Sequence, residues 1–285
     1  MSVVAVIPAR YASTRFPGKP LAMIGEKPMI RWVYERVQRA SRVDRVIVAT
    51  DDERILEAVR AFGGEAVMTS GEHPSGTDRI AEAALGLDAE IIVNVQGDEP
   101  LIRGDVIDAC IRPLQEGAQE PVVTPCVRIR SLQDLRNPDV VKVVKSPAGR
   151  ALYFSRFPIP FDRGRKIDED CLSELSFWKH LGLYAYRRDF LLQYSRMAPS
   201  PLEKREKLEQ LRILENGYTI RVEETDYDSV GVDSPEDLEK IRDLFYEKVK
   251  EKPTPEDTIK ELKALRNNLT LQDLSVKEMI AKRRK

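Results

Sequence analysis

Residues 3–21 read VVAVIPARYASTRFPGKPL, and this stretch decides the fold. It opens on an apolar, β-branched run at residues 3–8, which is typical of a buried strand. A loop of small and basic residues follows, and helical periodicity begins only at residues 29–40. A second β-branched run at residues 45–50 completes a strand–loop–helix–strand unit, from which sheets with helices on their faces are built.

The same alternation continues through the first half of the chain. Helical patterns occur at residues 52–61 and 76–85, and a fully apolar strand is predicted at residues 91–95. Strands that alternate with helices predict an α/β fold with three layers and a mostly parallel sheet. Ligands bind such sheets beyond the carboxyl ends of the strands, so the loops at residues 8–20 and 96–100 are the expected place for a site.

The middle of the chain, residues 121–187, has a different pattern. Three stretches predict strands with no regular helices between them: residues 122–127, 140–144 and 181–186. A polar stretch at residues 162–176 predicts an exposed loop. We therefore expect an inserted β-rich section, of the kind that completes an active site or a dimer contact.

The C-terminal third is predicted to be mainly helical. One helix is expected at residues 201–216, ended by Gly217, and Ser234 is placed to cap another helix whose first turn holds Pro235. After Lys248 a proline-containing linker leads to two short amphipathic patterns.

We therefore predict a main domain at residues 1–248 and a helical appendage at residues 249–285. Isolated helices of this length are marginal in water, so the appendage is expected to pack on the main domain or to dock on a partner.

Composition excludes several classes of protein. The net charge is −1, from 46 basic and 47 acidic residues, which argues against nucleic acid as a partner. The three cysteines, Cys110, Cys126 and Cys171, are odd in number and far apart, which favours a reducing, cytoplasmic location. The apolar run at residues 3–7 is too short for a signal peptide or a membrane span, so no membrane insertion is expected.

The first loop carries the strongest chemical signal. Arg10, Arg15 and Lys19 place three cations within ten residues, among small residues that let backbone amides approach a ligand. A polyphosphate needs this combination of amides, planar guanidinium groups and a flexible ammonium. A solvated basic loop is the alternative, but the position after the first strand favours phosphate binding. The loop lacks the P-loop pattern of a glycine-rich turn ending in Gly-Lys-Ser/Thr.

A second signal follows the apolar strand at residues 91–95, which delivers Gln96, Asp98 and Glu99 to the same crevice. A carboxylate opposite a phosphate loop is a natural Mg²⁺ ligand, because this cation prefers oxygen and is shared with phosphates. Asp233, just before the capped helix, is a second candidate. Either aspartate alone could be structural, at a turn or a helix start, whereas the two together predict a metal site.

The chain has two histidines, His73 and His180. No metal-ligand spacing links them, so zinc is not expected.

Several motifs, taken together and in this order, resemble one known family. They are residues 7–21, SGTDR (75–79), NVQGDEP (94–100), ALYFSR (151–156), HLGLY (180–184), LEQLR (208–212) and GVD (231–233). The resemblance is to the CMP–Kdo synthetases, the 3-deoxy-manno-octulosonate (Kdo) cytidylyltransferases of Gram-negative lipopolysaccharide synthesis, and it covers about residues 1–248. It implies a fold of the nucleotide-diphosphosugar transferase type, a homodimer, and the formation of CMP-Kdo and pyrophosphate from CTP and Kdo.

The resemblance also implies roles for individual residues. Those matching the nucleotide site, together with the loop cation Arg15, are Arg10, Ser13, Lys19, Ser75, Gly76 and Arg79. Those matching positions around the sugar acid are Gln96, Arg156, His180, Tyr184 and Glu209. Asp98 and Asp233 match the magnesium carboxylates and, with Arg10 and Lys19, form the expected catalytic set.

Two other functions stay open at this point. A cytidylyltransferase for a related acidic sugar, such as 8-amino-Kdo or a nonulosonic acid, would differ only in the sugar pocket. A non-catalytic nucleotide-binding module is the third reading, and the presence of Arg10, Lys19, Asp98 and Asp233 together argues against it.

Overall fold

The computed structural model describes residues 1–12, 16–164, 167–168, 172, 174–228 and 230–250. The chain divides into two compact units, Met1–Leu238 and Glu239–Lys285. All but the first two residues of the predicted appendage at residues 249–285 lie outside the described residues.

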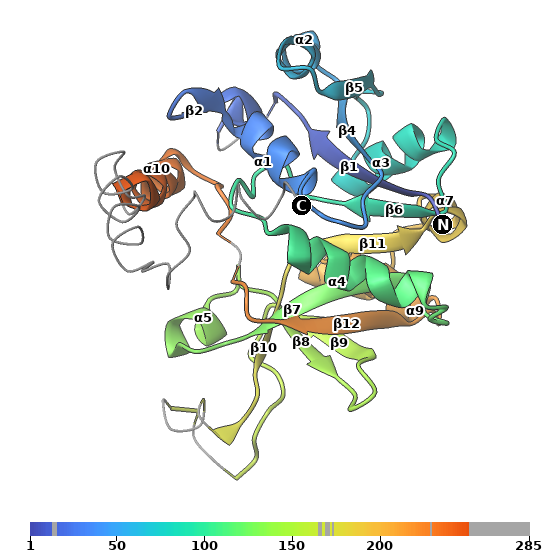
Figure 1. Ribbon diagram of the computed structural model, residues 1–285. Helices are drawn as coiled ribbons and strands as arrows, with labels where there is room; N and C mark the ends of the chain where they lie inside the picture. Colours follow the sequence, from blue (N-terminus) through green and yellow to red (C-terminus); the bar gives the residue numbers. More distant parts are fainter. Residues whose placement is uncertain (13–15, 165–166, 169–171, 173, 229, 251–285) are drawn as a thin grey trace, which may run out of the picture. The chain divides into compact units, whose positions relative to one another are not determined.

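The first unit contains a large sheet and the helices that cover it (Figure 1). The strands of this unit are β1 (Val3–Ala9), β2 (Met23–Ile24), β3 (Lys27–Pro28), β4 (Arg45–Thr50), β5 (Glu65–Met68), β6 (Ile91–Asn94), β7 (Val122–Arg128), β8 (Lys142–Lys145), β9 (Ala151–Ser155), β10 (Trp178–His180), β11 (Tyr184–Arg187) and β12 (Ile220–Thr225). Strands β2 and β3 pair with each other in a separate small sheet. The helices are η1 (Lys19–Leu21), α1 (Met29–Val37), α2 (Glu53–Ala61), α3 (Gly76–Leu85), α4 (Gly104–Gln115), α5 (Leu132–Arg136), α7 (Arg188–Tyr194), α8 (Pro201–Glu206), α9 (Gln210–Glu215) and α10 (Pro235–Lys250), the last of which continues into the second unit.

The sheet is parallel in the half that forms the site. Strands β5, β4, β1 and β6 lie side by side and run parallel, as expected for strands joined by helices. Strand β11 then pairs antiparallel with both β6 and β7. The short antiparallel strands β10, β8 and β9 extend the sheet, and β12 runs parallel to β7. The inserted β-rich section is therefore continuous with the main sheet.

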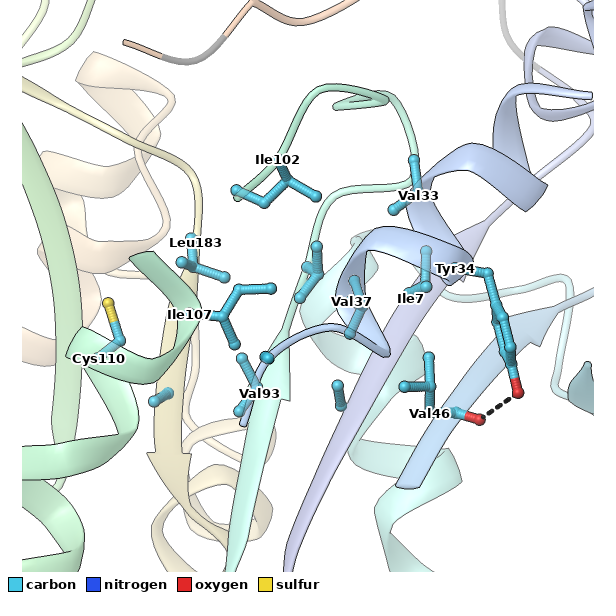
Figure 2. Close-up of a cluster of buried hydrophobic side chains, with 14 of the residues drawn as sticks. Ile7, Val33, Tyr34, Val37, Val46, Val93, Ile102, Ile107, Cys110 and Leu183 are labelled. Carbon is cyan, nitrogen blue, oxygen red and sulfur yellow. Dashed lines mark hydrogen bonds between the residues drawn. The ribbon is translucent and has the colours of Figure 1, made fainter. Parts of the chain in front are cut away.

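Helices cover both faces of this sheet, because successive strand residues point to opposite sides. On one face, Ile7 of β1 and Val93 of β6 pack with Val33 of α1 and Ile107 of α4 (Figure 2). Tyr34 of α1 closes this cluster and donates a hydrogen bond from its hydroxyl to the Val46 carbonyl, at 3.1 Å.

The opposite face has its own core. Val4 and Val6 of β1 pack there with Ile80 of α3, Leu191 of α7 and Leu211 of α9. The result is the predicted three-layer α/β architecture.

Local signals in the first half gave the correct elements. Strands β1 and β4 and helices α1, α2 and α3 form where they were predicted, within three residues at each end. Asp52 and Ser75 cap α2 and α3 by accepting hydrogen bonds from the backbone amides of Arg54 and Asp78. Ser234 likewise accepts from the Asp237 amide at 3.2 Å, as its sequence position predicted for the helix that begins at Pro235.

The prediction of a single helix at residues 201–216 is wrong. The structure has two helices, α8 and α9, because Lys207 adopts a left-handed conformation with φ of 55°. The fold-back pairs buried Glu203 of α8 with buried Arg212 of α9, and their Oε2 and Nε atoms are 2.8 Å apart. The predicted stop at Gly217 is confirmed, since Asn216 is the C-cap of α9 and Gly217 has φ of 80°.

Two expectations for the middle section also need correction. The short helix α5 interrupts strands that were predicted to lack regular helices. The polar stretch at residues 162–176 is not wholly exposed, because Leu172 is only 6% exposed and packs with Leu135 and Phe177.

Cys110 and Cys126 are buried, unpaired thiols, and Cys171 lies outside the described residues. Among the helices that the structure describes, none is both long and apolar enough to cross a membrane.

Candidate active site

The predicted loops meet in one cavity of about 480 Å³ at the carboxyl ends of β1 and β6. The predicted site residues that line it are Arg10, Lys19, Ser75, Gly76, Arg79, Gln96, Asp98, Glu209 and Asp233. They come from segments far apart in the sequence, and except for Glu209, which precedes α9, they lie on segments that follow parallel strands ending at one edge. Arg10 is exposed there, whereas Ser13 and Arg15 lie outside the described residues.

Two glycines permit the close approach of these loops. A Cβ atom at Gly97 would lie 2.9 Å from the carbonyl oxygen of Pro8, so only glycine lets the loop after β6 touch the end of β1. Gly18 has φ of 71° and lies against the Tyr11 ring, immediately before η1. These contacts place Asp98 beside Lys19.

Lys19 joins both predicted metal carboxylates. Its ammonium Nζ lies 2.7 Å from Oδ2 of Asp98 and 3.6 Å from Oδ1 of Asp233. It also donates a hydrogen bond to the carbonyl of Val232, at 2.8 Å. The Val232 amide in turn donates to the Asp98 carbonyl at 3.0 Å, so the two carboxylate-bearing segments are tied to each other through their backbones.

The pair of carboxylates fits a Mg²⁺ ion that is shared with a bound phosphate. Within the described ranges, no group of three or more histidine, cysteine, aspartate or glutamate side chains is placed to hold a metal. Mg²⁺ rarely needs such a cage, because it is usually held by one or two carboxylates together with substrate phosphates and water. Asp98 and Asp233 supply this kind of donor set beside the cavity that Arg10 also lines.

The N-terminus of α3 also lies at this cavity. Ser75 caps this helix and Gly76 begins it, and both line the cavity. Backbone amides at a helix N-terminus attract phosphate or carboxylate groups. Arg79, by contrast, is 4% exposed. Its guanidinium donates to Asp51 at 2.9 Å and to Thr69 at 2.6 Å, so it links α3 to the segments that follow β4 and β5.

His73, for which the sequence predicts no metal-binding role, lines the same cavity. Its Nε2 atom contacts a carboxylate oxygen of Glu82, on α3, and that carboxylate also accepts a hydrogen bond from the Ser70 amide at 2.9 Å. Glu82 thus holds both ends of the turn that leads to Ser75. The only signal for this role was the position of His73 directly before the SGTDR motif.

Two residues expected around the sugar acid line the cavity. Gln96 donates from its amide nitrogen to the carbonyl of Gly182 at 3.1 Å, which links it to the segment before β11. Glu209 is largely enclosed, and burial raises the pKa of its carboxyl group, as does the nearby Asp78, while a hydrogen bond with Thr77 opposes this. Glu99, which was expected in the same crevice, is buried outside the lining residues.

The other three residues expected around the sugar acid do not line the cavity. Arg156 directs its guanidinium to backbone carbonyls, donating to Glu206 at 2.7 Å and to Pro138 at 2.9 Å. The His180 ring lies 5.1 Å from Phe154 and 5.3 Å from Tyr184, measured between ring centroids.

His180 is held as a neutral ring. Its Nε2 atom lies 3.0 Å from the Thr124 hydroxyl, which itself donates to the carbonyl of Leu183 at 2.7 Å. Burial lowers the pKa of His180 from 6.5 to about 3. The unfolded chain therefore binds a proton at this residue below pH 6.5 that the folded protein does not bind.

This difference predicts an acid-sensitive stability. Between pH 7 and pH 5.5 the wild-type protein should lose about 1 kcal/mol more free energy of unfolding than His180→Gln. The stability from this histidine is fully present above pH 6.5 and is lost as the pH falls toward 3. Urea unfolding of both proteins at the two pH values measures the effect, and equal losses would contradict it.

The fold and the cavity define an α/β nucleotide-binding enzyme of the nucleotidyltransferase class. A basic loop after β1, a helix N-terminus and two aspartates beside one lysine are parts that such an enzyme can use. The profile of the cytidylyltransferase family matches residues 4–220. The chain belongs to this family and, within it, to the 3-deoxy-manno-octulosonate cytidylyltransferases.

Relatives with that name match this chain over nearly their whole length. The 3-deoxy-manno-octulosonate cytidylyltransferase of Geobacter metallireducens is 58% identical over 245 residues, which cover 85% of this chain and 96% of the relative. That of Pelobacter propionicus is 57% identical over 249 residues, covering 86% and 98% of the two chains.

Solved structures agree with the fold. A CMP:2-keto-3-deoxy-manno-octonic acid synthetase complexed with CTP is 44% identical, with a TM-score of 0.81 over 87% of this chain and all of that one. A 4-diphosphocytidyl-2C-methyl-D-erythritol synthase from Anaerococcus prevotii is 12% identical, with a TM-score of 0.55 over 86% of this chain and 98% of that one. This second likeness concerns the fold alone.

Proposed function

We propose that this chain transfers CMP from CTP to the anomeric hydroxyl of Kdo, giving CMP-Kdo and pyrophosphate for lipopolysaccharide synthesis. The observation that carries the proposal is the meeting of Lys19 with both Asp98 and Asp233, at the wall of a cavity of about 480 Å³. Relatives that bear this activity in their names, and a related synthetase complexed with CTP, support it.

In this proposal the triphosphate lies over the first loop and the N-terminus of α3. Arg10, Lys19 and the amides near Gly76 would hold its oxygens and stabilise the charge that develops on departing pyrophosphate. Little covalent chemistry falls to the protein, since phosphoryl transfer depends on alignment and charge neutralisation. Mg²⁺, if held by Asp98 and Asp233, would neutralise phosphate charge and lower the pKa of the attacking hydroxyl.

The sugar acid would lie on the side of the cavity formed by Gln96 and Glu209. Its carboxylate needs a cation or several donors, and its hydroxyls need acceptors. Arg156 and His180 support this proposal indirectly, since Arg156 fixes the segment at Glu206 and Lys207, close to Glu209 in sequence. His180 lies beside Tyr184, at the start of the strand that follows Gly182.

A pyrophosphate-release assay with CTP, Mg²⁺ and a panel of sugar acids tests this function. With CTP, Kdo should support release. With Kdo, the other nucleoside triphosphates should not replace CTP. Faster turnover with 8-amino-Kdo or with a nonulosonic acid would assign the enzyme to that sugar. No release with any sugar acid would favour a non-catalytic nucleotide-binding module.

Lys19→Ala should lower kcat by at least about tenfold, because a phosphate-directed ammonium stabilises charge that develops in the transition state. Lys27→Ala is the matched control, since Lys27 pairs with Glu35 instead. Steady-state pyrophosphate release at saturating CTP and Kdo measures the effect. An unchanged rate together with normal CTP affinity would remove Lys19 from the mechanism.

The same family membership is our reason to propose a cytoplasmic homodimer that requires Mg²⁺. For residues 249–285 we propose a role outside the chemistry, as a segment that packs on the enzyme or docks on another protein.

A further inference from the structure

The Lys19 ammonium contacts both aspartates that are proposed to hold Mg²⁺. It is surrounded by three oxygens: Oδ2 of Asp98 at 2.7 Å, the carbonyl of Val232 at 2.8 Å and Oδ1 of Asp233 at 3.6 Å. These oxygens belong to two segments that are joined to each other by the hydrogen bond from the Val232 amide to the Asp98 carbonyl. The ammonium therefore has oxygen partners on both segments.

The charges of this group are nearly balanced. One ammonium between two carboxylates leaves a net charge of −1, and the Lys19 side chain is 15% exposed and the Asp98 side chain 30% exposed. An incoming dication would be repelled by the ammonium at close range and attracted by carboxylates that already have a partner. The Asp233 side chain is 70% exposed and lies farther from the ammonium, so Lys19 competes with a metal mainly at Asp98, at 2.7 Å.

The phosphate oxygens of a bound nucleotide are alternative partners for the Lys19 ammonium. Lys19 stands at the start of η1, and the cavity that it lines is also lined by Arg10 and by the N-terminus of α3. Both of these attract phosphate. Triphosphate oxygens held by these elements are ligands for which Lys19 can exchange its bonds to Asp98 and Val232.

We infer that Lys19 is an internal counter-cation that keeps divalent metal off Asp98 and Asp233 until a triphosphate draws its ammonium away. Metal and CTP therefore bind with positive coupling, and by linkage each raises the affinity of the other. The free protein binds metal weakly, and metal enters together with the nucleotide. This inference rests on the proposed magnesium role of the two aspartates.

In the experiment, Mn²⁺ alone is titrated into the nucleotide-free full chain. Electron paramagnetic resonance measures the concentration of unbound Mn²⁺ at each step. Lys19→Met should bind Mn²⁺ at least about tenfold more tightly than wild type, because it removes a positive charge that lies between the ligands. Lys27→Met is the matched control, because Glu35 keeps a second partner in Arg31, and it should bind as wild type does. Adding Asp98→Asn to Lys19→Met should abolish the gain.

Equal or weaker Mn²⁺ binding by Lys19→Met would overturn the inference, as would a gain that survives Asp98→Asn. Circular dichroism checks that the variant is folded, and Lys19→Gln provides a second neutral side chain if the methionine variant does not fold. The titration contains no CTP and no sugar acid, so its failure would leave the proposed function standing. A wild-type protein that releases no pyrophosphate would refute the proposed function and leave the titration result unchanged.

Discussion

Replacing Asp98 with asparagine is expected to lower kcat by about a thousandfold while leaving the protein folded. Asparagine keeps the shape of the side chain, but it removes the charge that faces the Lys19 ammonium at 2.7 Å. The same charge is the proposed ligand of Mg²⁺, and an amide oxygen is a much weaker ligand for this ion. Pyrophosphate release at saturating substrates, measured across Mg²⁺ concentrations, gives the effect.

A matched control separates the site from the general loss of a negative charge. Asp189 is 98% exposed at the start of α7, far from Asp98 in sequence, and Asp189→Asn should retain the wild-type rate. Melting temperatures of both variants should stay close to that of wild type. Full turnover by Asp98→Asn at ordinary Mg²⁺ concentration would remove this carboxylate from the mechanism.

Much of the first half could be predicted because its signals are local. β-branched runs, helical periodicity and capping residues such as Asp52 and Ser75 act within a few positions of themselves. The later strands depend on distant partners. β12 pairs with β7, about a hundred residues earlier, with Ile220 opposite Val122. No local sequence pattern predicts such a pairing.

The candidate site divides in the same way. Lys19, Asp98 and Asp233 meet because strand order gathers loops at one edge, and the general rule for α/β sheets predicts this from sequence. The rule brings Arg79 to the cavity, but it could not show that the Arg79 guanidinium is engaged by Asp51, or that Arg156 donates to backbone carbonyls. These partners come together only through tertiary folding.

The turn between α8 and α9 is a further case in which a buried contact outweighs local helical preference. A continuous helix would separate Glu203 from Arg212, whereas the left-handed Lys207 brings them together. Arg212 also donates to the carbonyl of Met197 at 3.1 Å, and its guanidinium lies 4.9 Å from the centre of the Tyr194 ring. The hydrogen bond that Arg212 donates to the Glu203 carboxylate raises the pKa of Arg212.

Arg212→Met should therefore lower the free energy of unfolding by about 3–5 kcal/mol, because it leaves the buried Glu203 carboxylate without its cationic partner. Arg205→Met is the matched control: Arg205 is exposed on α8, so its loss should change stability by less than about 0.5 kcal/mol. Urea unfolding at pH 7 measures both variants.

The double variant Glu203→Leu with Arg212→Met sharpens this last prediction. Removing both charges leaves no unpaired buried ion, so the double variant should be more stable than Arg212→Met alone. Stability that falls further, as the sum of two independent losses, would show that the charges do not act as a pair. Glu209, which lines the cavity, directly precedes α9, so a loosened turn should also raise the KM for the sugar acid more than that for CTP.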